Sequence, residues 1–283
     1  MTGVAVAASL FVAACGGQSP TETSAPADNG KRDVKIGAVT IVSHPSLDLV
    51  YEGIVEGLAE AGYTEGDNLT IDLQNPQGDQ ATLVNIANTY ASSDNDLFVA
   101  IATPPAQALA QVEQKRPIVF ASVTDPVAAG LVETMEAPGG NVTGTSDQLP
   151  TDLQLAVIKD ILPDVSSVGI VYSSAEVNAQ VQAERAIEAG KELGIEVKTA
   201  TVTNSSEVQQ AAESLDVDAY FVLVDNTVVS AIESMIQVAE ANGRLLVTSD
   251  ADSVERGAAA ALATDYKAQG IQTAGIIVDI LEG

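Results

Sequence analysis

Short polar side chains follow most of the apolar segments of this chain, at the points where the segments end. Hydroxyl, amide and carboxylate groups of this kind hold small polar molecules through hydrogen bonds and charge. In the first half they are Ser43, His44, Thr103, Thr124 and Asp125, and in the second half they are Asn178, Asp225, Asn226 and Asp250. The same residue types are preferred helix N-caps, so each position taken singly also has a structural interpretation. Two facing rows of them predict a hydrogen-bonding cage for a small solute.

His44 is the only histidine of the chain and invites a catalytic interpretation. A general base needs a partner and a substrate, and no Gly-x-Ser-x-Gly sequence supplies a nucleophile. A metal centre needs more than one histidine and one cysteine, and neither a dinucleotide-binding glycine motif nor a P-loop follows a predicted strand. We therefore expect His44 to contact ligand or to have a structural role, and we expect no catalytic residue, no metal and no cofactor.

The elements that must position these side chains repeat along the chain. Strands are predicted at 34–41, 69–73, 97–101 and 118–121 in the first half and at 168–172, 195–200, 220–224 and 245–248 in the second, with helices at 47–61, 81–91, 106–114, 176–193, 208–214 and 228–241. Such alternation gives a parallel sheet with helices on both faces. The predicted fold is α/β, with two similar doubly wound parallel-sheet lobes and a cleft between them at the carboxyl ends of the strands.

The glycine-rich segment 139–144 lies between the two halves and does not open a helix after a strand. Glycine gives the backbone the freedom that a hinge needs, so we predict a hinge or crossover there.

Composition limits both the cores and the partners. Hydrophobic residues make up 46% of the chain but aromatic residues only 4%, so the cores must be built from Ala, Val, Ile and Leu. The 39 acidic and 12 basic residues give a formal net charge of -27, which repels phosphate backbones and makes nucleic acid an unsuitable partner. Many acids recur at helical spacing, which is typical of solvated helix faces.

The single cysteine, Cys15, follows an apolar segment at 4–14 that is too short to span a membrane. The small residues before Cys15 and the Gly, Ser, Thr and Pro after it resemble a bacterial lipobox, in which the thiol is acylated and the chain is cut before it. We predict a lipoprotein signal segment at 1–14, lipidation of Cys15 and a flexible tether at 15–33. No Lys or Arg precedes the apolar segment. The protein is expected to be exported and anchored at the outer face of the cytoplasmic membrane, or on the periplasmic side in a two-membrane bacterium.

Several motifs resemble the substrate-binding lipoproteins of ABC transporters in the tryptophan/tyrosine-type amino-acid family. They are Thr103-Pro104-Pro105-Ala106, Thr124-Asp125-Pro126-Val127, Gly140-Asn141-Val142-Thr143-Gly144-Thr145-Ser146-Asp147, Asp225-Asn226-Thr227-Val228 and Ala263-Thr264-Asp265-Tyr266. The resemblance implies a type I periplasmic-binding fold and places Asp147 and Asp265 in the cleft with Thr103, Thr124, Asp125, Asn178, Asp225 and Asn226. It also implies an N-terminal lobe at 34–146 plus 260–283, a C-terminal lobe at 147–259, and closing C-terminal segments missing after residue 283.

The resemblance further implies a monomer that captures an amino acid, favouring an aromatic one, and delivers it to an ABC permease. Asp225, Asp250 or Asp265 could hold the ammonium group of such a ligand, and Thr103 and Thr124 with backbone N–H groups could hold its carboxylate. The alternatives are the same fold binding a sugar or nucleoside and an extracellular ligand sensor domain. A sugar site would need aromatic rings, for which Tyr51, Tyr172 and Phe120 are the candidates. We expect no enzyme activity.

Overall fold

The computed structural model describes residues 1–2 and 31–283, and two five-stranded parallel sheets organise the second of these ranges. The first sheet contains β1 (Val34–Thr40), β2 (Leu69–Gln74), β3 (Leu97–Ile101), β4 (Ile118–Ala121) and β5 (Val142–Gly144) in the order β2-β1-β3-β4-β5. The second contains β6 (Ser167–Ser173), β7 (Glu196–Val202), β8 (Ala219–Val222), β9 (Leu245–Thr248) and β10 (Ala260–Ala261) in the order β10-β9-β8-β6-β7. Read from β7, the second order matches the first strand for strand, so the predicted internal repeat is present.

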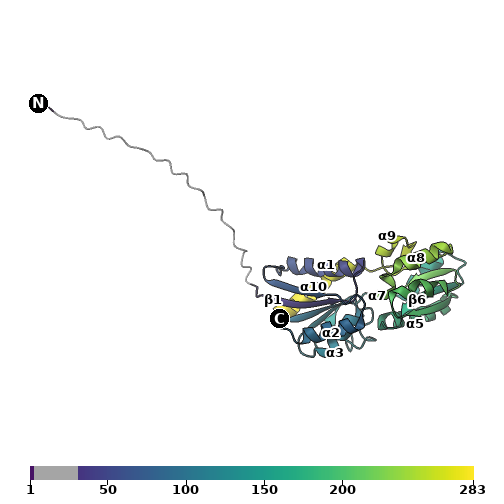
Figure 1. Cartoon of the computed structure of the whole chain (residues 1–283), viewed down its shortest axis with the longest axis horizontal. Coiled ribbons are helices and arrows are strands. Elements are labelled where there is room, and N and C mark those ends of the chain that lie inside the picture. The colour runs from purple at the N-terminus through teal and green to yellow at the C-terminus, as the bar shows by residue number, and fades with distance from the viewer. Residues whose placement is uncertain (3–30) are drawn as a thin grey trace. The chain divides into compact units, whose positions relative to one another are not determined.

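Helices connect the strands of each sheet. Those next to the first sheet are α1 (Pro45–Glu60), α2 (Gln80–Ala91), α3 (Thr103–Val112) and α10 (Tyr266–Glu282). Those next to the second are α4 (Thr151–Ile161), α5 (Val177–Leu193), α6 (Val208–Glu213), α7 (Asn226–Val229), α8 (Ile232–Ala241) and α9 (Asp252–Arg256), with a 3-10 turn at Ser205–Glu207. We call the first sheet with α1–α3 and α10 the first lobe, and the second sheet with α4–α9 the second lobe. Figure 1 shows α10, in yellow, among the elements of the first lobe.

Most of the strands are buried on both faces, which is why they read as continuous apolar segments in the sequence, whereas the edge strands β2 and β7 are partly exposed. All five residues of β3 and all four of β4 and β8 are buried. The core side chains are mostly aliphatic, as the composition predicts, with Phe98 and Phe120 in the first lobe and Tyr220 and Phe221 in the second.

Two predicted boundaries are wrong. The segment 142–144 is not a hinge but β5, the edge strand of the first sheet, where an added Cβ at Gly144 would lie 1.9 Å from the carbonyl oxygen of Phe120. The strand at 260–261 does not return to the first lobe. It pairs with β9 as the counterpart of β5, because the repeat places an equivalent edge strand there.

The chain passes between the lobes at 145–150, before α4, and at 262–265, before α10. The two crossings lie next to each other, since the Thr264 hydroxyl donates a hydrogen bond to the Asp147 carbonyl oxygen at 3.5 Å. Helices α4 and α9 were not predicted, and the helix predicted at 228–241 is interrupted between α7 and α8.

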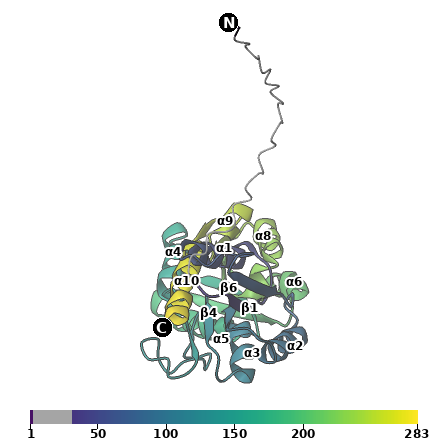
Figure 2. The ribbon, with the colours of Figure 1, turned by 90° about the vertical axis from the view of Figure 1, so that its left-hand side faces the viewer.

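Helices α1 and α10 pack with their backbones in contact, side by side in Figure 2. An added Cβ at Gly53 would lie 2.2 Å from the Lys267 carbonyl oxygen, and one at Gly270 would lie 2.2 Å from the Val50 carbonyl oxygen. Only glycine permits this approach, and it fixes the two helices against each other.

Candidate functional site

A small, largely enclosed cavity lies between the two lobes, at the carboxyl ends of their strands. Its lining residues are His44, Ser46, Leu47, Thr103, Ser122, Thr124, Asp147, Asn178, Val224, Asp225, Asn226, Val229, Asp250 and Tyr266. Eight of the eleven predicted binding residues are among them, because parallel strands of two facing sheets bring their carboxyl ends to one place.

The structure places the other three predicted side chains outside this lining, each with a protein partner. The Ser43 hydroxyl donates hydrogen bonds to the Asp48 carboxylate at 3.0 and 3.1 Å. Asp265 accepts a hydrogen bond from the Ala268 backbone N–H at 3.0 Å and caps α10. Asp125 forms an ion pair with Arg185 of the second lobe.

Six lining residues were missed by the sequence analysis: Ser46, Leu47, Ser122, Val224, Val229 and Tyr266. Ser122 directly follows β4, and Ser46 and Leu47 follow Pro45 in the first turn of α1, so the positional rule could have found all three. Tyr266 stands beside Asp265 in a motif already singled out. The two valines carry no polar group, and the sequence gives no signal for them.

The backbone is strained at the end of two strands of the first sheet. Ala102 has φ 82° and Ser122 has φ 56°, in a region that residues with a side chain rarely adopt. Ala102 precedes Thr103 and directs the start of α3 toward the cavity, where both Thr103 and Ser122 are found. Strain of this kind is concentrated at functional sites in proteins.

Two of the aspartates that line the cavity accept hydrogen bonds from backbone N–H groups. Asp225 accepts hydrogen bonds from the backbone N–H groups of Ser173 at 2.6 Å and Val228 at 2.9 Å. Asp250 accepts from the backbone N–H and the hydroxyl of Ser253, both at 2.8 Å. Burial raises the pKa of both carboxyls, and the negative charge of Glu176 raises that of Asp225 further.

Three other lining residues hold buried polar atoms without a hydrogen-bond partner. They are both ring nitrogens of His44, both carboxylate oxygens of Asp147 and the side-chain oxygen Oδ1 of Asn178. In the part of the chain that the structure describes, no other residue holds a buried side-chain nitrogen or oxygen without a partner. Buried polar groups are nearly always paired in native proteins, so their concentration in one cavity marks it as a place for a ligand.

Burial is the largest cause of the pKa shifts of Asp147 and His44, the two titratable residues among these three. It raises the pKa of Asp147 to about 6, although the hydroxyls of Thr124 and Tyr266 act in the opposite direction. It lowers the pKa of His44 to about 4, opposed by the nearby Asn226 and reinforced by the positive charge of Arg256. His44 is therefore neutral at pH 7, whereas Asp147 is mostly ionised and gains from a cation beside it.

A buried network in the second lobe fixes the wall of the cavity. The Glu176 carboxylate accepts hydrogen bonds from the Asn226 side-chain amide at 2.5 Å and from the Thr227 hydroxyl at 2.8 Å. Asn178 donates to the same carboxylate at 3.3 Å and to the Val224 carbonyl oxygen at 2.9 Å. Glu176 does not line the cavity, but it orients two residues that do.

Two polar contacts join the lobes. The Ser46 hydroxyl, at the start of α1, donates a hydrogen bond to the Asp252 carboxylate of α9 at 2.9 Å. The Arg185 guanidinium of α5 pairs with the Asp125 carboxylate of the first lobe. These contacts belong to a closed arrangement of the lobes.

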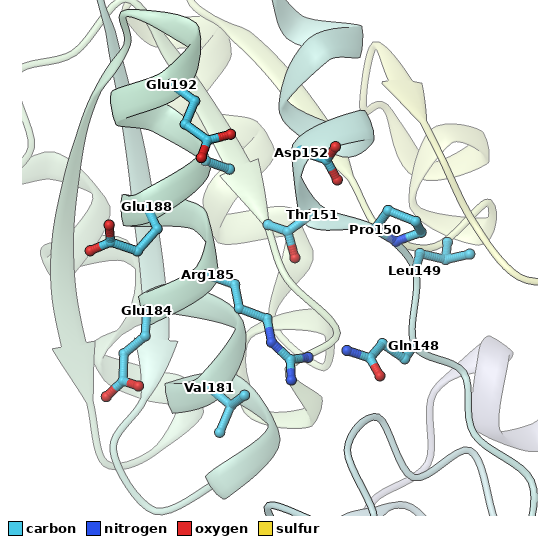
Figure 3. Close-up of a pocket in the computed structure, with 11 residues that line it drawn as sticks. Gln148, Leu149, Pro150, Thr151, Asp152, Val181, Glu184, Arg185, Glu188 and Glu192 are labelled. Atoms are coloured by element: carbon cyan, nitrogen blue, oxygen red, sulfur yellow. The ribbon is translucent and has the colours of Figure 1, made fainter.

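An open groove on the second lobe offers a less suitable site. It is lined by Gln148, Leu149, Pro150, Thr151, Asp152, Val181, Glu184, Arg185, Glu188, Ala189 and Glu192. Figure 3 shows the Arg185 side chain extending toward Gln148 across the groove. The glutamates are exposed to solvent, and no buried polar atom without a partner lies in this groove.

None of the helices in residues 31–283 combines the length and the apolar character needed to cross a membrane.

Comparisons with known proteins agree with the fold. A sequence model of the family described as ABC transporter substrate binding protein matches residues 35–283. The tyrosine-binding protein of Clostridioides difficile (strain R20291) is 38% identical over 257 residues, which are 90% of this chain and 74% of that protein.

Two solved structures have the same sequence identity to this chain but differ in their structural similarity to it. An ABC domain from Streptococcus pneumonia in complex with L-Trp is 38% identical with a TM-score of 0.86, covering 89% of this chain and 85% of that one. A ligand-free, open substrate-binding protein with adhesive properties from Clostridium difficile is also 38% identical, with a TM-score of 0.66 and coverage of 88% and 85%.

These similarities confirm the predicted family and the two-lobed α/β fold. Proteins of this family are solute-binding components of transporters rather than enzymes, and they act outside the cytoplasm. The chain belongs to the ABC transporter substrate binding protein family, as an extracytoplasmic solute-binding protein with a type I periplasmic-binding fold.

Proposed function

We propose that the protein captures an amino acid with an aromatic side chain in the cavity between its lobes and delivers it to a membrane permease. The observation that carries this proposal is the set of buried polar groups without partners, on His44, Asp147 and Asn178, in one cavity. The relatives support it, since one is named for binding tyrosine and another was solved with L-Trp.

Asp147 is the counter-charge for the ammonium group of the ligand. Of the aspartates in the lining, it is the one whose two oxygens have no partner, whereas Asp225 and Asp250 already accept backbone N–H groups. An ammonium ion can donate to both oxygens and replace the water that burial removed. This assignment differs from the expectation that Asp225, Asp250 or Asp265 holds the ammonium.

The carboxylate of the ligand fits the N-terminus of α1. Ser46 and Leu47 lie in the first turn of this 16-residue helix and line the cavity, and the backbone N–H groups of a first turn have no acceptor within the helix. Such groups and the helix dipole favour an anion. The Thr103 hydroxyl, at the start of α3, is close by in the same lining.

The remaining lining surface suits a flat apolar ring. Leu47 from the first lobe and Val224 and Val229 from the second supply apolar contacts, and Tyr266 supplies an aromatic one. Tyr51, Tyr172 and Phe120, the rings that a sugar site was expected to use, do not line the cavity. The lining therefore favours an aromatic amino acid over a sugar.

The lobes are arranged as a closed binding protein would hold them around ligand. The structure is more similar to the L-Trp complex, at TM-score 0.86, than to the open, ligand-free protein, at 0.66, although both are 38% identical to this chain. Closure around ligand also accounts for the burial of the lining residues.

Several further properties complete the proposal. The protein acts as a monomer without catalytic activity, and lipid on Cys15 holds it at the membrane beside its permease. The signal segment and Cys15 lie outside the described residues.

Isothermal titration of purified protein against the amino acids, a nucleoside series and a sugar series tests the proposal. We expect saturable binding of at least one aromatic amino acid and none of the nucleosides or sugars. Protein that binds a sugar or nucleoside but no aromatic amino acid would overturn the proposed ligand class. Mass spectrometry of solute released by denaturation provides an independent readout.

A further inference from the structure

The orientation of the Asn178 side-chain amide is fixed by two acceptors. Its nitrogen donates to the Val224 carbonyl oxygen at 2.9 Å and to the Glu176 carboxylate at 3.3 Å. A flipped amide would place its oxygen against these two oxygens, which is unfavourable. The oxygen Oδ1 must therefore be the free atom, and it is buried without a partner.

Gln182, one helical turn further along α5, reinforces this arrangement. Its amide nitrogen donates to the Asn178 and Val224 carbonyl oxygens, both at 3.0 Å, and its oxygen accepts from the Val224 backbone N–H at 3.1 Å. Gln182 does not line the cavity. The segment around Val224 and the start of α5 are thus held together, with Oδ1 of Asn178 presented as a rigid acceptor.

The acceptors in the cavity outnumber the donors of an ammonium group. Asp147 contributes two oxygens, Asn178 contributes one, and the neutral His44 ring contributes one nitrogen, all without partners. An ammonium group donates three hydrogen bonds, and the charged Asp147 is its preferred partner. Asn178 Oδ1, whose own amide nitrogen is already used, is therefore available to a further N–H or O–H donor of the ligand.

We propose that Asn178 Oδ1 accepts a hydrogen bond from a donor on the ring of the ligand, and thereby selects tryptophan or tyrosine over phenylalanine. The hydrogen bond between Asn178 and Val224 keeps Oδ1 beside the apolar wall on which the ring packs. This inference rests on the proposed function, because it concerns the ring of an aromatic amino acid.

Phenylalanine has no ring donor and would leave Oδ1 buried and unpaired. Sites built to bond a ligand N–H or O–H group discriminate strongly against analogues that lack it. We expect the dissociation constant of phenylalanine to exceed that of the preferred ring-donor ligand by about 10- to 100-fold.

Titrations of the wild-type protein with tryptophan, tyrosine, phenylalanine and para-aminophenylalanine form the first test. The amino group restores a ring donor to phenylalanine, so para-aminophenylalanine is expected to bind more tightly than phenylalanine. Equal affinities for all four would overturn the inference while leaving the proposed function intact. Failure of all four to bind would overturn the proposed function itself.

The variant Asn178→Leu forms the second test, since leucine has a similar shape but no acceptor. We expect phenylalanine to bind this variant as well as it binds wild type or better, and the preference for ring donors to fall to within about threefold. If the variant instead weakens all ligands by one factor, Asn178 contacts the amino-acid backbone and the inference is wrong. Gln180→Leu is the matched control, because Gln180 lies on the same helix, donates to the Ser174 carbonyl oxygen at 2.7 Å and does not line the cavity; it is expected to keep the preference for ring donors.

Discussion

The guanidinium of Arg185 on α5 of the second lobe pairs with the carboxylate of Asp125, in the loop that follows β4 of the first lobe. One carboxylate oxygen of Asp125 also accepts a hydrogen bond from the Ala128 backbone N–H at 2.8 Å, which fixes it within its own lobe. Sequence analysis placed Asp125 in contact with ligand, but this geometry makes it a contact between the lobes. The pair therefore joins the second lobe to the first.

Loss of this ion pair should shorten the time that ligand stays bound. The Arg185 side chain is 38% exposed, so water screens the pair, and its loss costs about 1 kcal/mol. We expect Arg185→Gln to raise the dissociation rate about fivefold and to leave the association rate nearly unchanged. Stopped-flow fluorescence with tryptophan as ligand suits this measurement, because the chain itself contains no tryptophan.

Lys191→Gln is the control for this change. Lys191 lies on the same helix and pairs with Glu188 of the same lobe. Its loss should leave the dissociation rate unchanged. Equal rates for the two variants would show that the pair between lobes does not retain ligand.

Asp147→Asn should weaken binding and stabilise the ligand-free protein. Loss of a charge-assisted hydrogen bond reduces affinity by about 10- to 150-fold. The same change removes a buried carboxylate whose pKa is raised from 3.8 to about 6. Ionisation of this group at neutral pH lowers the free energy of unfolding of the ligand-free protein by on the order of 3 kcal/mol. Titration calorimetry and urea unfolding without ligand measure the two effects, with the exposed Asp152→Asn as control. Weaker binding together with lower stability would point to a folding defect instead.

Asp147 and His44 should have opposite effects on how the stability of the ligand-free protein changes with pH. Burial raises the pKa of Asp147 from 3.8 to about 6, so its stabilising contribution is present at low pH and is lost as the pH rises through 6. Burial lowers the pKa of His44 from 6.5 to about 4, so stability is lost as the pH falls from 6.5 toward 4.

The urea concentration at which half of the protein is unfolded, measured between pH 4 and pH 7, separates the contributions of the two residues. Compared with wild type, Asp147→Asn should lose more stability on acidification, and His44→Gln should lose less. Parallel curves for all three proteins would contradict the assigned protonation states.

Cys15→Ser should release the exported protein from the membrane. In the proposed lipidation the lipid is attached through the thiol of Cys15, and serine cannot take its place in that modification. Detergent-phase partitioning and labelling with a radioactive fatty acid in a bacterial host measure the change. Wild-type protein that remains entirely in the aqueous phase would contradict lipidation.

The sequence was sufficient to predict the central strands of both sheets and the edge at which the cavity lies. Buried parallel strands read as apolar segments, and their repeated order indicated two lobes before any contact was known. Thr103, Thr124 and Asn226 then follow from their positions after strands, because the fold brings those positions together. The short edge strand β5 escaped notice, since three residues carry no periodicity, and the strand at β10 was expected from the resemblance alone and in the wrong lobe.

The roles of the aspartates could not be predicted in this way. Asp225, Asp250 and Asp265 each accept a backbone N–H group three residues ahead, and Asp147 does not. A helix cap and a ligand contact require the same residue type, so the sequence gives no means of separating them. Only the hydrogen bonds of the folded chain show which carboxylate remains unpaired.

The backbone contact between α1 and α10 also determines how the site comes apart. Leu47 stands at the start of α1 and Tyr266 at the start of α10, and the glycines at positions 53 and 270 prevent either helix from sliding past the other. When the lobes separate, these two lining residues must move as one rigid body. In the proposed binding cycle, a departing ligand is therefore expected to lose Val224 and Val229 together with the second lobe while Leu47 and Tyr266 still form a half-site on the first.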